Sequence, residues 1–344
     1  MSTAFPLLRL PDNAQRKVLN GFDSVQLINF SLLSNNAKQL AKSLNLTIDS
    51  INLYADDDFI EINTYVNYEQ SLGLAFYPPE PSTGIQSVRG TVPIYVPRRV
   101  KAEKNFEDIM EFENPGMSIS EWLKLLKEVF NHPPVLDISW TEPDCLFDMK
   151  SLKDTVNGFS VGEHTFTEQC SIECAQLALK NMPESKTVLF EGPAFGNPVD
   201  YQDMLIQNVK RLVIGSCDDL HSFDLKISLD DILLINSEWI EIISRHVTDK
   251  MINRFLKHWI KGSNPRMEHM RIRFEPNRIF DKDMILKGLK YRRAQPIRNI
   301  FRMINLGVCS AEGGVDIRRK DGTEGTITFI NRNGNSSIVF YVSN

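Results

Sequence analysis

The sequence predicts a mixed α/β protein made of three successive parts. Short helical patterns with capping residues open the chain, an extended segment follows, and units of one helix and one strand then repeat toward the carboxyl end. Turn signals near the end predict a last group of strands. We therefore expect a three-helix module at residues 1–46, a short antiparallel β unit at 47–117, and a repeat region with a β C-terminal cap at 118–344.

Composition restricts the class of protein. The hydrophobic fraction of 42% and the charged fraction of 24% are typical of a globular chain, and the net charge of −5 argues against a nucleic-acid partner. We expect no membrane partner, because no apolar run approaches the roughly 20 residues of a membrane helix. The charged first twenty residues predict no secretory signal, and five cysteines in 344 residues do not form a disulfide scaffold. These features favour a cytoplasmic and/or nuclear protein with reduced cysteines.

Three candidate caps define the N-terminal helices. Asp12 is predicted to cap the first helix, with Gln15 three residues later as its capping-box partner. Asp23 or Ser24 can cap the second helix, and Ser34 restarts the chain before the third. A unit of this size is rarely stable alone without metals, disulfides or a partner. The apolar residues that its own small core cannot bury should therefore face either the rest of the chain, with the module acting as a helical cap, or another protein.

The order of residues in this module is specific. Its segments are Leu10–Pro11, Val18–Leu19, Asp23–Leu27, Ser31–Ser34 and Lys38–Leu40. This series resembles the F-box. F-boxes bind a Skp-type adaptor, which links them to a cullin and a RING protein in SCF ubiquitin ligases, so the resemblance implies these partners.

The resemblance covers residues 5–44. It favours adaptor contact by the apolar residues of the entry segment and the first two helices. The residues expected to contact the adaptor are Phe5, Leu8, Leu10, Pro11, Val18, Leu19, Leu27 and Phe30.

The second part has extended patterns separated by polar turns. Asp56, Asp57 and Asp58 form one such turn. Three adjacent carboxylates on an extended chain point to alternate sides, so a solvated turn is favoured over a metal site.

The third part repeats a helix, a turn and a strand. Ser118 and Glu121 predict a capping box, and the clearest unit runs from Thr248 to Phe274, with Gly262 ending its helix. The spacings of roughly 24–31 residues are near those of leucine-rich repeats. We therefore expect an irregular leucine-rich-repeat-like helix/strand solenoid; an ordinary α/β domain with crossover helices is the alternative.

The expected strands are Val135–Trp140, Phe159–Val161, Thr187–Phe190, Arg211–Ile214, Trp239–Ile243 and Met270–Phe274. Those of the cap are Val315–Arg318, Thr326–Ile330 and Ser337–Val342, separated by the turns Asp321-Gly322 and Asn333-Gly334.

A second resemblance lies within residues 190–275. The runs Leu229–Ser237, Asn253–Trp259 and Gly262–Glu268 are similar to the F-box-associated domain (type 2) of the expanded nematode F-box family. The resemblance implies that this region binds the target protein.

The chain shows no constellation for catalysis, and we expect no catalytic residue, cofactor or metal. Cys170 and Cys174 lie near His164, but no second ligand pair follows, so buried structural cysteines are favoured over a zinc site. Adjacent carboxylates such as Asp218-Asp219 and Asp230-Asp231 do not face one point and are poor acid/base partners.

Positive charge concentrates in residues 266–302, which hold eleven Lys or Arg and four acidic residues. This segment could steer an acidic or phosphorylated partner, or it could form a solvated face. Arg271 and Arg273 alternate with apolar residues on an expected strand, so we expect them on its exposed face as candidate substrate-binding residues.

These observations predict a non-catalytic substrate-recognition subunit of an SCF-type cullin-RING ubiquitin ligase. Its N-terminal helices would bind the adaptor and its C-terminal region an unknown target protein. The alternative is an adaptor-independent repeat scaffold for protein–protein interaction, whose N-terminal helices only cap the repeats.

Overall fold

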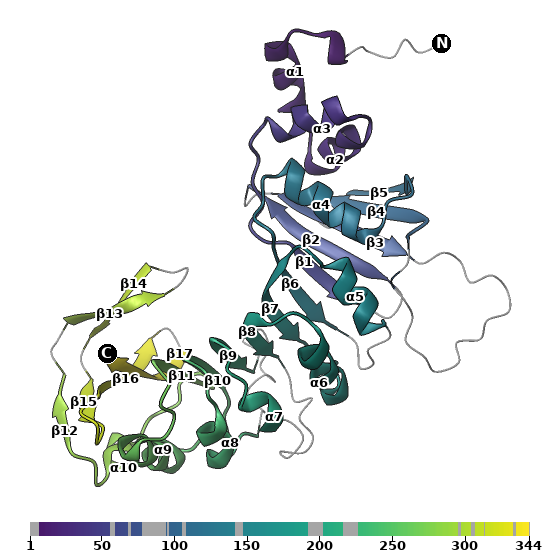
Figure 1. The fold of residues 1–344 in the computed structure, drawn as a ribbon. Helices are drawn as coiled ribbons and strands as arrows, with labels where there is room; N and C mark the ends of the chain where they lie inside the picture. Colours follow the sequence, from purple (N-terminus) through teal and green to yellow (C-terminus); the bar gives the residue numbers. More distant parts are fainter. Residues whose placement is uncertain are drawn as a thin grey trace. The chain divides into compact units, whose positions relative to one another are not determined.

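The chain divides into two compact units in the computed structural model (Figure 1). Unit 1 holds residues 1–164 and 173–184, and unit 2 holds residues 165–172 and 185–344. The residues that the structure describes are 7–55, 59–67, 70–77, 94, 96–104, 108–141, 147–191, 202–215, 226–294, 297–303, 307–312, 314–332 and 335–343. Four sequence predictions lie outside them, namely those on Phe5, Asp56–Asp58, Asp218-Asp219 and the turn at Asn333-Gly334.

Unit 1 opens with three short helices, as the sequence predicts. A 3-10 turn precedes them. The bounds are η1 (Leu7–Arg9), α1 (Asp12–Leu19), α2 (Ser24–Leu32) and α3 (Asn35–Lys42).

Local capping explains where two of these helices begin. The Asp23 side chain accepts a hydrogen bond from the Gln26 backbone N–H at 2.8 Å, and the Gln26 side chain accepts one from the Asp23 N–H. Ser34 accepts from the backbone of α3 in the same way. The prediction for α1 was wrong: Pro11 is the N-cap residue and Asp12 is already helical. Proline suits the start of a helix, where an N–H has no intrahelical partner.

An antiparallel sheet follows in unit 1, as expected for its second part. Strands β1 to β5 pair antiparallel in sequence order. On its other side β1 pairs in parallel with β6, so the antiparallel unit continues into the first helix/strand unit. The bounds are β1 (Asn52–Ala55), β2 (Ile60–Val66), β3 (Gln70–Tyr77), β4 (Arg99–Lys104), β5 (Asp108–Glu113), α4 (Ile119–Val129), β6 (Val135–Trp140), α5 (Met149–Thr155), β7 (Ser160–Phe166) and α6 (Ile172–Asn181).

The N-terminal helices pack on the rest of unit 1 and are not a separate bundle. Lys38 on α3 lies 2.9 Å from Glu128 on α4, and Asp23 lies 3.6 Å from Lys104 on β4. The predicted capping box of α4, Ser118 with Glu121, is confirmed. One continuous packed unit therefore carries both the N-terminal module and the antiparallel sheet.

Unit 2 alternates strands with short helices. Strands β8 to β11 pair in parallel, and the predicted bounds of β9 and β10 are confirmed. In Figure 1, α8, α9 and α10 lie together on one side of these strands. The bounds are β8 (Ser185–Phe190), α7 (Gln202–Leu205), β9 (Arg211–Ile214), α8 (Leu229–Leu234), β10 (Trp239–Ile243), α9 (Asp249–Lys261), β11 (His269–Phe274) and α10 (Lys282–Leu286).

The unit containing α9 and β11 follows its sequence signals closely. Thr248 caps α9, and Gly262 ends it in the left-handed conformation with φ of 119°, which a side chain would disfavour. Trp259 is fully buried, and its ring packs edge-on against Phe340 with 4.7 Å between ring centroids. A core of helix and strand side chains therefore closes this part of unit 2.

The three predicted C-terminal strands are present, and they extend the parallel strands with an antiparallel group. Strand β11 pairs with β17, which pairs with β16, then β15, then β12. In this C-terminal part, β12, β13 and β14 correspond to no strand expected from the sequence. The bounds are β12 (Tyr291–Arg293), β13 (Ile297–Met303), β14 (Gly307–Glu312), β15 (Val315–Arg318), β16 (Glu324–Arg332) and β17 (Asn335–Ser343).

Within the described part of the chain, no helix is both long enough and apolar enough to cross a membrane.

The prediction of uniformly reduced cysteines fails at Cys174, which is disulfide-bonded. Cys170 is a free, buried thiol, and burial raises its pKa to about 12.

Candidate functional site

Several apolar side chains of the N-terminal helices face solvent. Leu8 is 46% exposed and Val18 is 37% exposed, while Pro11 is exposed and Leu10 is half-buried. Leu33, at the end of α2, is 73% exposed and was not among the predicted contact residues. Exposed apolar groups gathered on so small a module are what a partner surface can bury.

The other predicted contact residues of this module form its core. Leu19, Leu27 and Phe30 are buried, with at most 7% of each exposed. The Phe30 ring packs edge-on against Phe22, with ring centroids 6.1 Å apart. Side chains buried in this way hold the helices together, so they would support a contact surface without forming it.

Gln15 fixes the segment that leads into α1. Its side-chain amide donates hydrogen bonds to the carbonyl oxygens of Leu10, at 2.7 Å, and Leu8, at 3.3 Å. This differs from the predicted capping box, in which the Gln15 side chain would accept from the cap residue. The buried amide instead holds the 3-10 turn against α1, which positions the exposed Leu8.

Parallel pairing aligns side chains in rows on one face of β9–β11. Arg211, Trp239 and His269 form one row, and Glu241 and Arg271 stand side by side in the next. We call this face, opposite the buried Met270, Ile272 and Phe274 of β11, the strand face. As predicted, Arg271 and Arg273 alternate with these buried residues and lie on it, both half-buried.

Glu241 is the centre of the charged group on the strand face. The Arg273 Nε atom lies 2.6 Å from Glu241 Oε1, Arg211 Nη2 lies 3.4 Å from Oε2, and Arg271 Nη1 lies 3.9 Å from Oε1. The Glu241 side chain is 14% exposed, whereas the three arginines are between 29% and 44% exposed. One carboxylate therefore organises guanidinium groups from two neighbouring strands. The sequence does not reveal Glu241 as a member of this group, because its proximity to Arg271 depends on the register between strands.

Aromatic rings line the same face beside the charged group. The His269 ring lies 4.9 Å from Trp239 and 5.3 Å from Tyr341, measured between ring centroids. Burial lowers the pKa of His269 to about 4; Glu241 opposes this shift, and Arg271 and Arg211 add to it. His269 is therefore neutral at pH 7, and the positive charge of this face comes from arginine.

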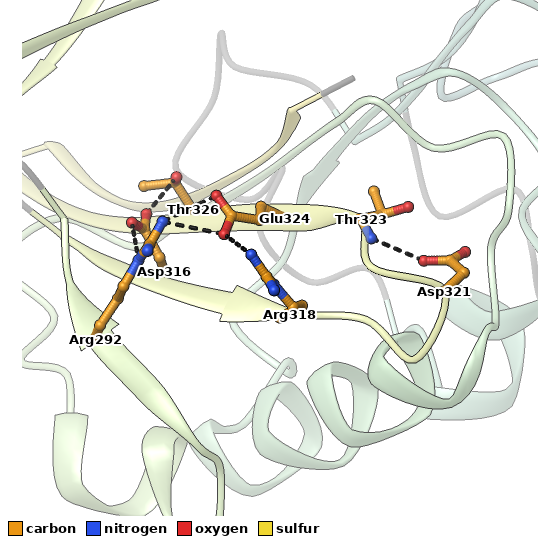
Figure 2. Close-up of polar contacts among 7 residues, drawn as sticks. All are labelled: Arg292, Asp316, Arg318, Asp321, Thr323, Glu324 and Thr326. Carbon is orange, nitrogen blue, oxygen red and sulfur yellow. Dashed lines mark hydrogen bonds and ion pairs between the residues drawn. The ribbon is translucent and has the colours of Figure 1, made fainter.

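A second charged cluster joins β12, β15 and β16. Figure 2 shows Arg292 between two carboxylates, 3.2 Å from Asp316 and 2.9 Å from Glu324. Arg318 also reaches Glu324, at 2.8 Å, and Thr326 donates to the buried Asp316. The hydrogen bond from Arg318, followed by the charge of Arg292, lowers the pKa of Glu324.

Acidic residues from other segments pair with the basic segment at 266–302. Arg266 pairs with Glu238, and Arg278 lies 2.8 Å from Asp249. Arg271, Arg273 and Arg292 have the partners described above. Five of the eleven basic residues of this segment therefore have acidic partners from elsewhere in the folded chain.

The described residues contain no group of three or more His, Cys, Asp or Glu side chains that could hold a metal ion. Burial lowers the pKa of His164, whose Nε2 lies 3.1 Å from the Pro183 carbonyl oxygen and whose Nδ1 lies 3.4 Å from Trp140 Nε1. The second adjacent carboxylate pair also has a structural explanation, because the buried Asp231 is the capping-box partner of Ser228 in α8.

Comparison with known families identifies both regions. Residues 7–49 match the F-box domain family, and residues 200–272 match the F-box associated family. The chain carries an F-box and an F-box-associated region. Both resemblances noted in the sequence are therefore confirmed. The F-box comprises η1 and α1–α3, and the F-box-associated match spans α7 to most of β11.

One curated relative is the F-box associated domain-containing protein sdz-33 of Caenorhabditis elegans. It is 46% identical over 48 residues, which is 14% of this chain and 16% of the relative. The similarity thus spans less than a fifth of either protein. No solved structure matches the chain.

Proposed function

We propose that this chain is the substrate-recognition subunit of an SCF-type cullin-RING ubiquitin ligase. In this role it performs no chemistry itself. Its F-box binds a Skp-type adaptor, through which a cullin and a RING protein are recruited, and its C-terminal region holds a target protein. Catalysis in such an assembly depends on proximity between the bound target and the transferred group.

The observation that supports adaptor binding is the exposed apolar surface of a module whose core is already closed. Leu8, Val18 and Leu33 remain accessible while Leu19 and Leu27 are almost fully buried. Burying such side chains against a partner is favourable, at about 25 cal/mol per Å² of apolar area. Pro11 is also exposed and Leu10 is half-buried, whereas Phe30 belongs to the core of the module.

For the target we propose the repeat region, in which stacked helix/strand units form an irregular solenoid closed by the C-terminal strands. The alternation of parallel strands with helices in unit 2 supports this arrangement. Arg271 and Arg273 are the candidate target contacts, because they lie half-exposed on the strand face. The division into a module at 1–46, a β unit at 47–117 and a recognition region at 118–344 is part of this proposal.

The test is a binding assay between the purified chain and a panel of Skp-type adaptors. We expect the wild type to bind, and the double variant Leu8→Asp, Val18→Asp to lose at least about tenfold in affinity, because a well-buried anchor contributes ~1–4 kcal/mol. Both positions are exposed, so the variant should remain folded by circular dichroism. Leu19 does not suit this assay, because its substitution would disturb the core of the module.

Ile279→Asp is the matched control, since Ile279 is 88% exposed and lies in unit 2. It should bind the adaptor like the wild type. Unchanged binding by the double variant would show that Leu8 and Val18 do not contact the adaptor. If the wild type binds no adaptor, the F-box helices serve only as a cap. The alternative function, an adaptor-independent repeat scaffold, would then be favoured.

A further inference from the structure

The outward side of α9 carries a row of basic side chains. These residues recur at spacings of four, three and four residues, namely Lys250, Arg254, Lys257 and Lys261. At 3.6 residues per turn they fall within an arc of about 60°. The opposite side of the helix is formed by the buried residues Ile252, Phe255, Leu256 and Trp259. Three of the four basic residues are exposed and Lys257 is half-buried, so the row faces solvent.

Two further lysines lie at the edges of this row. The Asn253 side chain of α9 donates a hydrogen bond to the Lys287 carbonyl oxygen at 2.9 Å, which holds the end of α10 beside α9 (Figure 1). The Lys320 backbone N–H donates to the Ile260 carbonyl oxygen at 3.0 Å, near the carboxyl end of α9. Lys287 and Lys320 are both exposed. We call these two lysines and the four basic residues of the row the basic face.

Two acidic residues beside this face already have other partners. Asp249, the first residue of α9, lies 2.8 Å from Arg278, and Asp321 lies 3.3 Å from Arg319. Asp283, which is exposed on α10, is the acid that remains against six cations. Among the described residues, none of these six cations forms an ion pair with a carboxylate. The basic face therefore keeps an excess of positive charge after folding.

This arrangement is unfavourable for the helix itself. Like charges three or four residues apart on a helix destabilise it. The helix dipole favours Lys261 in the last turn, but it disfavours Lys250 in the first turn. Helix α4 of the same chain instead combines its two lysines with Glu121 and Glu128. Because folding does not require the row of cations, a binding surface is favoured over a solvated face.

The chemistry of the basic face favours an acidic protein segment as its partner. Five of the six cations are lysines, which act as point charges and lack the guanidinium fork that binds phosphate in two places. The apolar side of α9 is buried in the core of unit 2, so this helix has no apolar face to place in a membrane surface. The net charge of −5 disfavours a long polyanion such as a nucleic acid.

We propose that the basic face binds a segment of another protein that is about five residues long and rich in Asp and Glu. The row on α9 spans about 16 Å, a length that an extended chain covers with about five residues. Trp259 of α9 packs on Phe340, which pairs with Met270. Helix α9 therefore covers the side opposite the strand face, and the proposal is independent of both the adaptor contacts and the candidate target contacts.

A fluorescein-labelled hexaglutamate peptide, titrated with the full chain and followed by fluorescence anisotropy, tests the proposal. We expect saturable binding at about 50 mM NaCl and at least about tenfold weaker binding at about 500 mM, because salt screens exposed charges. The row variant replaces four cations with Gln, which preserves helix propensity. Its substitutions are Lys250→Gln, Arg254→Gln, Lys257→Gln and Lys261→Gln. We expect it to lose at least about tenfold in affinity for the peptide.

The matched control removes four positive charges from exposed lysines elsewhere. Its substitutions are Lys124→Gln, Lys150→Gln, Lys153→Gln and Lys186→Gln. The row variant and the control have the same net charge, so the control should bind the peptide within about twofold of the wild type. Equal losses in the two variants would overturn the proposal, because they would show attraction by net charge alone.

Two other results would also overturn the proposal, namely no peptide binding by the wild type and unchanged binding by the folded row variant. If the row variant does not fold by circular dichroism, the double variant Arg254→Gln, Lys257→Gln replaces it, with an expected loss of about threefold. An oligouridine with six phosphates is the second probe. If it binds more tightly than the peptide, and this binding depends on the same row, the partner is a nucleic acid and the proposed acidic segment is wrong.

Discussion

The F-box and the strand face of unit 2 differ in how they present groups to a partner. The F-box exposes Leu8, Val18 and Leu33 above a closed core, so a partner can bury them without breaking any existing contact. The strand face holds Arg271 and Arg273 around Glu241, so the proposed target would have to compete with a carboxylate already in place. An apolar surface of the first kind suits one constant partner, whereas a charged surface of the second kind favours discrimination between partners.

The largest expected effect distinguishes a core position of the F-box, Leu19, from the adjacent surface position, Val18. Leu19→Ala should lower the free energy of unfolding by about 2–5 kcal/mol, because Leu19 is fully buried and its truncation leaves a cavity. Val18→Ala, at a position that is 37% exposed, should change the free energy by no more than about 0.5 kcal/mol. Urea denaturation followed by circular dichroism measures both. Equal losses at the two positions would contradict the assignment of Val18 to the surface.

The second effect concerns the pH dependence of the strand face. The pKa of His269 falls from 6.5 to about 4 on folding, mainly through burial, so the unfolded chain binds a proton more readily than the folded chain. The stability gained from the neutral ring is present above pH 6.5 and is lost as the pH falls toward 4. As the pH falls from 6.5 to about 4, the free energy of unfolding of the wild type should decrease by about 2–3 kcal/mol more than that of His269→Phe. The Phe side chain keeps the ring stack but does not titrate.

Parallel urea titrations of both proteins across this pH range would measure the difference. The comparison between two proteins removes the contribution of the carboxyl groups that they share. Identical pH profiles would show that folding does not lower the pKa of His269, which would contradict its burial as the cause of the shift.

The third and smallest effect tests whether Glu241 organises the arginines. Glu241→Gln should lower the free energy of unfolding by about 1–2 kcal/mol. This is less than the loss of a fully buried ion pair would cause, because the three arginines are partly exposed. The control is Glu111→Gln in unit 1, where Glu111 and Arg99 form an exposed pair worth about 0–1 kcal/mol. Urea denaturation at low and high salt measures both. If the two substitutions cost the same, Glu241 would be one more surface ion pair.

Local signals in the sequence predicted much of the secondary structure. The caps at Asp23, Ser34 and Ser118 and the stop at Gly262 depend on interactions within a few residues, which the sequence displays directly. The α1 cap was wrong because both Pro11 and Asp12 suit a helix start, and the choice depends on how the preceding turn is held. The strands β12 to β14 were missed because their segments lack clear alternation of apolar and polar residues.

The sequence by itself determined the family of the two regions, the repeated helix and strand units, and the alternation that places Arg271 and Arg273 opposite the core. Only the tertiary structure decided which apolar residues of the F-box are accessible and which acidic residue holds the arginines. Exposure depends on what packs over a side chain, and the contacts of Glu241 depend on the register of three strands. Both are set by contacts between residues far apart in the chain, which helical or strand periodicity does not encode.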